Sequence, residues 1–214
     1  FMRDLLKKEG LDVPLITSDN PVDENLRGGM VEGALPTGNF GSKTREKFKV
    51  LRNHTTGPLM IGEFWVGWFD YWGNGGHMKG DLERSVTDLD DCLKEGNVNI
   101  YMFIGGTNFG FMNGSNYYDE LTPDVTSYDY DALLTEDGRI TEKYEKFREV
   151  IARYAPVPEV KLTTKILRKA YGELRCEGKV SLSYVLEDIS SPVQSKYPVS
   201  MERLDQSYGY ILYR

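Results

Sequence analysis

Residues 81–104 read DLERSVTDLDDCLKEGNVNIYMFI, and this stretch decides the fold class. In its first half, apolar residues recur at the i, i+4, i+7, i+11 spacing of one helix face: Leu82, Val86, Leu89 and Leu93. Gly96 ends the helical pattern, and Val98–Ile104 is then almost entirely apolar, as in a buried strand. The stretch therefore predicts an amphipathic helix followed directly by a strand.

The same alternation extends on both sides of this stretch. Upstream, Ser42 has the character of an N-cap for a helix reaching about His54, and Leu59–Phe64 reads as a buried strand. Downstream, Thr141–Tyr154 places its apolar residues on one helix face. Buried strands alternating with amphipathic helices indicate a parallel sheet covered by helices, which is an α/β fold.

Two α/β architectures fit this pattern, a doubly wound open sheet and a (β/α)8 TIM barrel. The open sheet favours a phosphate-binding glycine loop that follows a strand and opens a helix. Gly73–Gly76 has the wrong spacing for such a loop, and Gly105–Asn108 leads into no predicted helix. The long aromatic loops after the strands favour the barrel, whose chemistry lies at its C-terminal face. Since about four strand–helix units fit before residue 155, we expect at most half of a barrel.

The N-terminal part of the chain carries weaker signals. Phe1–Glu9 fits a helix, and Val13–Ile16 is an apolar run ended by the turn residues Thr17–Pro21. Val31–Leu35 is a weaker strand candidate that Pro36 closes. Because the chain opens inside a helix without an initiator methionine, we expect a fragment of a longer protein.

The pattern changes towards the C-terminus. Pro156–Pro158 reads as an extended linker. Beyond it, Val180–Val185 alternates apolar and polar residues, and Tyr208–Tyr213 is aromatic and strand-like. We therefore predict two domains, with residues 1–155 forming part of the barrel and residues 156–214 forming a linker and the start of an all-β domain.

Composition and charge restrict the class of protein. The chain has 214 residues, of which 40% are hydrophobic and 28% charged, and this composition argues against disorder. No apolar run reaches the ~18–20 residues of a membrane span, and no signal peptide is visible, so the compartment stays undetermined. The 26 basic residues are scattered among 33 acidic ones, giving a net charge of −7, which argues against a nucleic-acid partner.

Metal and disulfide chemistry find little support in the sequence. Cys92 falls in a predicted helix and Cys176 in a predicted strand, where buried small hydrophobes are more common than a disulfide. No pairing of these cysteines with His54 or His77 has zinc-site spacing. The two histidines read as capping or surface residues. We expect neither a metal nor a cofactor.

The strongest candidate for chemistry stands at the end of the strand Leu59–Phe64. All three tryptophans, Trp65, Trp68 and Trp72, lie within one stretch of eight residues, shortly after Glu63. An ionised carboxylate at the end of an apolar strand is costly to desolvate unless a polar site opens there. Carboxylates ringed by aromatic planes suit a glycosidase, because indoles cover the C–H face of a sugar while the acid acts on an oxocarbenium-like centre.

The residues alone leave other interpretations open. An aromatic run at a barrel rim can simply seal the core, and Glu63 could pair with a buried arginine. The loop Thr126–Ala132 holds two tyrosines and two aspartates, and a phenol there can donate a hydrogen bond to a nucleophilic carboxylate, although a solvated turn explains it equally well. Asn108 could bind sugar hydroxyls, but it is weak evidence for a sugar site on its own, since asparagine is common in turns.

Four segments together resemble one family. They are Pro58–Gly73, Asn99–Gly110, Thr126–Ala132 and Leu204–Arg214. In this order they are similar to the nucleophile segment, the last barrel strand, the tyrosine loop and the start of the first β domain of family 35 glycoside hydrolases, the retaining β-galactosidases. Each segment alone is moderate, but the four run nearly end to end in the right order.

This resemblance implies the C-terminal half of a (β/α)8 catalytic barrel, followed by β-sandwich domains. It makes Glu63 the nucleophile that forms a galactosyl-enzyme intermediate. Tyr130 matches the family tyrosine that contacts substrate beside the nucleophile. Trp68, Trp65 and Tyr128 match the aromatic wall of the galactose pocket.

The sequence departs from the family pattern in two places. Phe111 stands where many members have tyrosine, so a hydroxyl contact is missing, although the ring could still pack against sugar. A retaining mechanism needs two carboxyl groups ~5–5.5 Å apart, and the family takes the second from an Asn-Glu pair on the fourth barrel strand. Because this chain has no Asn-Glu dipeptide, we expect the acid/base glutamate to be absent and the chain alone to be inactive.

The expected function is removal of terminal non-reducing β-D-galactose from a galactoside or a galactose-terminated oligosaccharide. Two alternatives stay open: the same enzyme acting on another β-glycoside such as a β-glucosaminide, and a non-catalytic carbohydrate-binding fragment that uses the tryptophans as a sugar platform. Half a barrel leaves strand edges bare, so we also expect self-association or association with the missing half.

Overall fold

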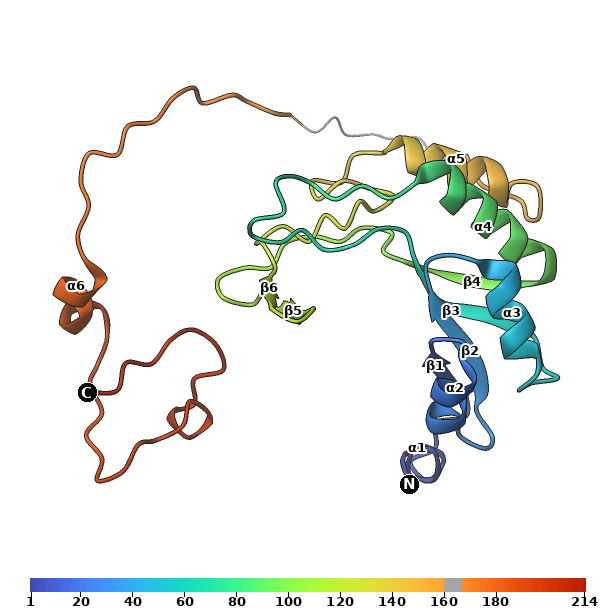
Figure 1. Ribbon diagram of the computed structural model, residues 1–214, viewed down its shortest axis with the longest axis horizontal. Helices are drawn as coiled ribbons and strands as arrows, with labels where there is room; N and C mark the ends of the chain where they lie inside the picture. Colours follow the sequence, from blue (N-terminus) through green and yellow to red (C-terminus); the bar gives the residue numbers. More distant parts are fainter. Residues whose placement is uncertain (160–166) are drawn as a thin grey trace. The chain divides into compact units, whose positions relative to one another are not determined.

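The computed structural model describes residues 1–159 and 167–214. The chain divides into two units, Phe1–Leu162 and Thr163–Arg214. The first unit is built on a parallel sheet of four strands: β1 (Ile16–Asp19), β2 (Leu35–Phe40), β3 (Leu59–Trp65) and β4 (Gly96–Tyr101). The strands lie side by side in the order β1-β2-β3-β4 (Figure 1), which confirms the predicted α/β fold with a parallel sheet. Closure into a (β/α)8 barrel stays a prediction.

Helices connect the strands and cover the sheet. The helix α1 (Met2–Lys8) precedes β1, and three helices follow β1, β2 and β3 in turn: α2 (Asp23–Gly29), α3 (Thr44–Arg52) and α4 (Leu82–Glu95). After β4, a short hairpin of β5 (Ser115–Tyr117) and β6 (Leu121–Pro123) precedes α5 (Glu142–Ile151). Figure 1 shows α3, α4 and α5 side by side, and α4 contacts both of its neighbours.

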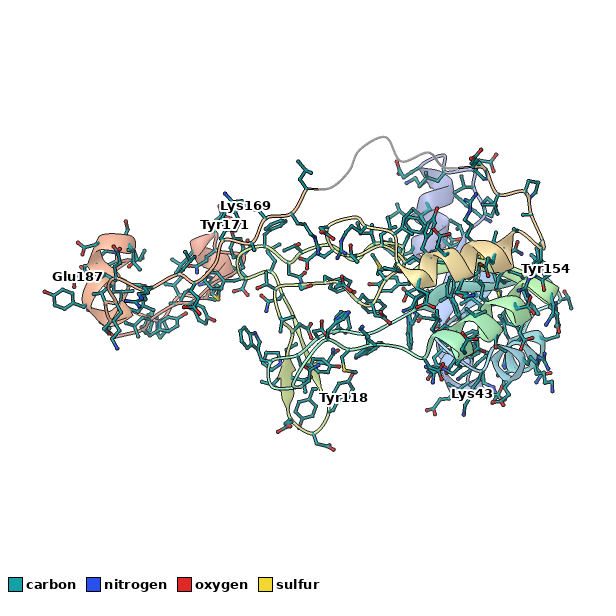
Figure 2. All side chains as sticks on the ribbon, turned by 90° about the horizontal axis from the view of Figure 1, so that it is seen from above. Lys43, Tyr118, Tyr154, Lys169, Tyr171 and Glu187 are labelled. Carbon is teal, nitrogen blue, oxygen red and sulfur yellow. The ribbon has the colours of Figure 1, made fainter. Side chains whose placement is uncertain are left out.

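The core lies between these helices and β3. Leu59, Ile61 and Phe64 of β3 are buried, and the Phe64 ring stacks on Phe147 of α5 with the ring centroids 6.2 Å apart. Burying one such side chain fully contributes roughly 1.5–3 kcal/mol. Just beyond α5, the Tyr154 hydroxyl donates to the carboxylate of Asp90 on α4 at 2.8 Å, which ties the two helices together (Figure 2).

Two helix starts follow their sequence signals. The Asp81 carboxylate accepts a hydrogen bond from the Arg84 N–H at 3.0 Å and caps α4, the predicted helix. The Thr141 hydroxyl accepts from the Tyr144 N–H at 3.2 Å and caps α5. The helices predicted in the stretch from residue 81 and at Thr141–Tyr154 are therefore confirmed, and each of the two caps lies at the end of its own helix.

The predicted cap at Ser42 is wrong. The helix α3 begins at Thr44, and its N-cap is Lys43, which has a left-handed backbone (φ 62°) and no side-chain cap bond. The Thr44 N–H donates instead to the carboxylate of Asp88 on α4, at 2.7 Å. A contact from a distant helix therefore replaces the local cap.

The two N-terminal strands lie later in the chain than predicted. The apolar run Val13–Ile16 reaches β1 only with its last residue, and the predicted turn residues Thr17–Asp19 form the rest of the strand. The predicted strand Val31–Leu35 gives way to β2, which continues through Pro36. All four residues of β1 pair in parallel with β2, so pairing between strands outweighs the local turn signals.

The strand predicted at Val98–Ile104 lies earlier in the chain, where it forms β4 over Gly96–Tyr101. Pairing with β3 joins Leu59 to Gly96 at one end and Trp65 to Tyr101 at the other, and these partners set the ends of β4. The helix α2 was not predicted from the sequence. Its only buried residue is Leu26, so no repeated apolar spacing marks it as a helix.

In the second unit, the predicted strand at Val180–Val185 is wrong. The structure has the helix α6 (Leu182–Ile189) at this place. The short 3-10 helix η1 (Glu202–Leu204) follows further along the chain, and Tyr208–Tyr213 contains no strand. The six-residue alternation is ambiguous, because apolar residues at 182, 185, 186 and 189 also follow helical spacing. The β-sandwich domain over residues 156–214 therefore stays a prediction.

The two cysteines are free and differ in their surroundings. Cys92 is buried in α4, as predicted, and burial raises the pKa of its thiol to about 12. The prediction of a buried Cys176 in a strand is wrong, because this residue is exposed and outside any strand. In the described ranges, no helix has the length and apolar character needed to cross a membrane.

Candidate active site

Glu63 lies near the C-terminal end of β3, where the backbone register is irregular. The pairing of β3 with β2 shifts between Gly38 and Asn39, and its pairing with β4 shifts between Ile61 and Phe64. Such bulges bend a strand and re-aim its side chains. The result is that Phe64 is buried against α5 while Glu63 is only half-buried.

The Glu63 carboxylate is hydrogen-bonded by its neighbour on the same strand. The indole N–H of Trp65 donates to Glu63 Oε2 at 3.1 Å. Because side chains two residues apart lie on one face of a strand, the spacing alone brings these groups together. The donor is thus an indole and not the buried arginine that the alternative interpretation requires.

Two tyrosines from the loop between β6 and α5 are close enough to Glu63 for its charge to affect their pKa values. The rings of Tyr128 and Tyr130 are stacked with centroids 5.6 Å apart and an interplanar angle of 12°. Burial raises the pKa of both phenols, and the negative charge of Glu63 adds to the increase. Both hydroxyls therefore stay protonated at neutral pH and can donate hydrogen bonds.

Aromatic rings extend from Glu63 to the tyrosine loop. The Trp68 ring lies 5.6 Å from Trp65 and 6.3 Å from Tyr130, measured between centroids. Phe69 fills the space next to them, with its centroid 5.2 Å from Trp68 and 5.5 Å from Tyr130. Besides Glu63 and Phe111, four residues were predicted for the site, and all four belong to one packed cluster: Trp65, Trp68, Tyr128 and Tyr130.

Three further members of this cluster were not predicted. Phe69 sits between the tryptophans and the tyrosines, and the Tyr101 hydroxyl at the end of β4 lies 2.9 Å from that of Tyr128. The Trp68 indole N–H donates to the Tyr71 hydroxyl at 2.5 Å. Burial, together with a hydrogen bond to Tyr118, raises the pKa of Tyr71 to about 12. The position of Tyr101 at a strand end was the signal that could have indicated it.

Two of the aromatic residues lie outside this cluster. Phe111 is 57% exposed and Trp72 is 72% exposed. The Trp72 N–H donates to the Pro123 carbonyl of β6 at 2.9 Å, and Phe111 lies four residues before β5 in the chain. Figure 2 shows Tyr118 at the turn of the same hairpin. The predicted packing of Phe111 against sugar is not tested by this position.

Glycines allow the tyrosine loop to lie directly against the ends of β3 and β4. A Cβ atom added to Gly67 would stand 1.6 Å from the Tyr130 carbonyl oxygen. One added to Gly105 would stand 1.6 Å from the Tyr128 carbonyl oxygen. Since no side chain fits at such distances, these glycines fix how closely the two tyrosines approach the strand ends.

Glu136 holds the other side of the tyrosine loop. Its carboxylate accepts hydrogen bonds from the hydroxyls of Thr107 and Ser127, and its N–H donates to Asp129 Oδ2 at 3.0 Å. Thr107 belongs to the loop after β4. The predicted sugar ligand Asn108 also joins these loops, through its backbone N–H to the Thr126 carbonyl at 2.8 Å.

The ring nitrogens of the two histidines lie within hydrogen-bond distance of carboxylates. His77 bridges two loops, with Nδ1 2.7 Å from Asp70 and Nε2 3.2 Å from Asp129. His54 Nε2 lies 2.7 Å from Asp23. Among the described residues, no group of three or more His, Cys, Asp or Glu side chains could hold a metal ion.

Comparison with known proteins matches the sequence of the chain to one family. Residues 1–154 match the family described as Glycosyl hydrolases family 35. The Beta-galactosidase of Macaca fascicularis is 39% identical over 211 residues, which cover 96% of this chain and 30% of that protein. The Beta-galactosidase of Homo sapiens is 38% identical over 211 residues, with coverages of 96% and 31%.

A third relative carries a different name. The Beta-galactosidase-1-like protein 3 of Homo sapiens is 36% identical over 222 residues, which cover 100% of this chain and 33% of that protein. The chain thus spans about a third of the length of the curated relatives that it matches. Because the family match covers well over half of the chain, and in agreement with the four sequence segments, the chain belongs to glycosyl hydrolases family 35.

Proposed function

We propose that this chain carries the nucleophile side of the active site of a retaining exo-β-galactosidase. Glu63 attacks the anomeric carbon of a terminal β-D-galactose and forms a galactosyl ester as the bond to the leaving group breaks. Water then cleaves the ester, and the two displacements together retain the anomeric configuration. The observation that carries the proposal is a half-buried carboxylate at a strand end, hydrogen-bonded by an indole and subject to the fields of the buried Tyr130 and the half-buried Tyr128.

Each neighbouring ring has a role in this reaction. Trp65 binds Oε2 of the carboxylate at 3.1 Å, which orients it and leaves Oε1 to attack. Tyr128 and Tyr130 have raised pKa values and remain protonated, so they can donate to the carboxylate or to a sugar hydroxyl. Trp68 and Phe69 supply the apolar wall against which the C–H face of a sugar packs.

The leaving group needs a proton, and this comes from a second carboxylic acid ~5–5.5 Å from the nucleophile. We place that acid/base glutamate outside these 214 residues, on another part of the same (β/α)8 barrel, because the chain has no Asn-Glu dipeptide. The 214 residues alone then hydrolyse no galactoside at a measurable rate. Loss of the general acid removes ~10²–10⁴-fold by itself, and the missing strands remove part of the pocket.

The names of the relatives favour galactose as the sugar. Two of the relatives described above are named Beta-galactosidase. We therefore propose a galactoside or a galactose-terminated oligosaccharide as substrate. A β-glucosaminide is the nearest alternative, and the ratio of kcat/KM for the two nitrophenyl glycosides, measured on the protein with its complete barrel, decides between them.

The packing of the tryptophans speaks for an enzyme pocket rather than a non-catalytic sugar platform. Trp65 and Trp68 meet edge to face, with an interplanar angle of 63°. A flat binding platform needs exposed rings in one plane. Micromolar binding of galactose by the 214-residue chain, followed by tryptophan fluorescence, would support the platform instead.

Removal of the nucleophile and its replacement by a small anion test the mechanism. In the protein with its complete barrel, Glu63→Gly lowers hydrolysis by on the order of 10⁴-fold or more. Azide then fills the space of the lost carboxylate, attacks the same face and gives the α-galactosyl azide. Retained hydrolysis in this variant, or a β-configured azide product, contradicts the proposed role of Glu63.

A further inference from the structure

Lys143 is a buried lysine close to the candidate site. It is the second residue of α5 and only 5% exposed. Lysine is almost never buried without a partner, because its ammonium group is costly to remove from water. Here the Nζ atom has three acceptors, all of them on segments that belong to the site.

Those acceptors join two distant parts of the chain. Nζ donates to the Val66 carbonyl at 2.7 Å, and to both the carbonyl and the Oδ2 of Asp131 at 2.5 Å. Val66 directly follows the β3 segment that carries Glu63, and Asp131 directly follows Tyr130. One ammonium group therefore connects the carboxylate strand with the tyrosine loop.

The tyrosine loop has a backbone that needs such support. Tyr130 and Asp131 both have left-handed φ angles, 62° and 50°, which residues with a side chain rarely adopt. Asp131 Oδ2 also accepts the Gly80 N–H at 2.8 Å, so the loop before α4 joins the same junction. The conformation that places the Tyr130 ring is thus held from outside the loop, at Asp131.

We propose that Lys143 is a positioning residue for the glycosidase reaction, acting through Asp131 and Val66 to set the placement of Tyr130 relative to Glu63. This inference rests on the proposed function. Lys143 itself is buried and its three bonds all go to protein atoms, so its effect on the reaction passes through the residues that it joins. A shift of about 1 Å in such a placement costs up to about 10²-fold in rate.

The test uses the protein with its complete barrel and a 2,4-dinitrophenyl 2-deoxy-2-fluoro-β-galactoside. The amount of dinitrophenolate released counts the functional sites, and the first-order rate constant reports the attack of Glu63 at each of them. For Lys143→Met, we expect this rate constant to fall about tenfold or more, with the apparent inactivator binding constant changing less than about threefold. Asp131→Asn, which removes only the charge of the partner, should give a fall of the same kind.

Two further variants sharpen the test. Lys146→Met is the matched control, because Lys146 lies on the same helix but on its surface and, among the described residues, pairs with Glu149 alone, at 3.6 Å. It should leave the rate constant per site unchanged. The Lys143→Met/Asp131→Asn double variant should lose less than the product of the two single losses, because both remove one junction.

The outcomes separate this inference from the proposed function. In one outcome, Lys143→Met and Asp131→Asn reduce only the number of functional sites, counted by dinitrophenolate release, and leave the rate constant per site unchanged. In that case Lys143 is only structural and the inference is overturned. If the fluoro sugar labels a residue other than Glu63 in the unsubstituted protein, the proposed function itself fails. Labelling at Glu63 with an unchanged rate constant in both variants rejects the positioning role alone.

Discussion

β3 and α6 are both short apolar segments, but only β3 is anchored. In β3, strands pair on both sides and the side chains of Leu59, Ile61 and Phe64 are buried. In α6 no residue is buried, and the same holds for every described residue from 167 to 214. Apolar character thus gives a fixed structure only where other elements supply the partners.

This difference matters for function because a catalytic group must be held in place. Glu63 follows directly on the buried part of β3 and faces a loop that is fixed by Gly67, Lys143 and Glu136. In the second unit, none of the described residues from 167 to 214 is buried. If this contrast is correct, matched substitutions in the two regions must differ in effect.

The largest expected difference concerns two glutamates. In the protein with its complete barrel, Glu63→Gln should lower kcat/KM for a nitrophenyl β-galactoside by on the order of 10⁴-fold, because the amide cannot form the glycosyl ester. Glu187 of α6 is 85% exposed, so Glu187→Gln should change kcat/KM less than about twofold. Equal effects of the two substitutions on kcat/KM would contradict the claim that β3, and not α6, carries a catalytic group.

The second difference concerns the two thiols. Burial raises the pKa of Cys92 to about 12, whereas Cys176 is exposed. In the folded 214-residue chain, Cys176 should react with a disulfide reagent at least about 10³-fold faster at pH 8, because the thiolate is the reactive form. In urea the two rates should become similar, and this serves as the control. Equal rates without urea would show that α4 does not exclude solvent from Cys92.

The third difference concerns two glycines. Gly67→Ala should lower the free energy of unfolding by about 3 kcal/mol or more, because the new Cβ meets the Tyr130 carbonyl at 1.6 Å and forces the tyrosine loop away. Gly178→Ala, in the second unit, has no atom within 4 Å of the added Cβ and should change it by less than about 0.5 kcal/mol. Urea unfolding measures both, and a harmless Gly67→Ala contradicts the described contact.

The smallest expected effect concerns a buried carboxyl. Burial raises the pKa of Asp124 above its ordinary value of 3.8, and its Oδ1 has no hydrogen-bond partner among the described residues. The folded state therefore holds this proton more tightly. Its stabilising contribution is complete below pH ~3.8 and is lost as the pH rises through the folded pKa.

Asp124→Asn removes this titration. At pH 7 it should increase the free energy of unfolding by about 1 kcal/mol, and the gain should disappear near pH 4. Asp188→Asn, at an exposed position of α6, is the control and should have no such pH dependence. Thermal unfolding at both pH values measures the effect, and a loss of stability at pH 7 in Asp124→Asn would contradict it.

The features predictable from sequence are those whose causes lie close together in the chain. Asp81 and Thr141 cap their own helices, and Glu63 and Trp65 meet because strand side chains alternate. The observed ends of β1 and β2 differ from the predicted ones, because the pairing between these strands determines where they end and local turn residues do not. In α6 the local pattern was ambiguous, and none of its residues is buried, so packing does not decide between helix and strand.

The parts of the site that were missed depend on long-range contacts. A lysine at position 143 reads as a surface residue of an amphipathic helix, yet it is buried and donates a hydrogen bond to the carbonyl of Val66, 77 positions away. Gly67 reads as a loop glycine until Tyr130 is placed against it. Tyr101 joins the cluster only because β4 ends beside the tyrosine loop.

The most direct measurement is covalent labelling of the protein with its complete barrel by a 2-deoxy-2-fluoro-β-galactosyl fluoride, followed by digestion and mass spectrometry of the peptides. The slow turnover of the fluoro sugar traps the ester between sugar and nucleophile. We predict a single labelled residue, Glu63, within the peptide that contains Trp65 and Trp68. A label on any other carboxylate, or none despite release of fluoride, would contradict the assignment of Glu63 as the nucleophile.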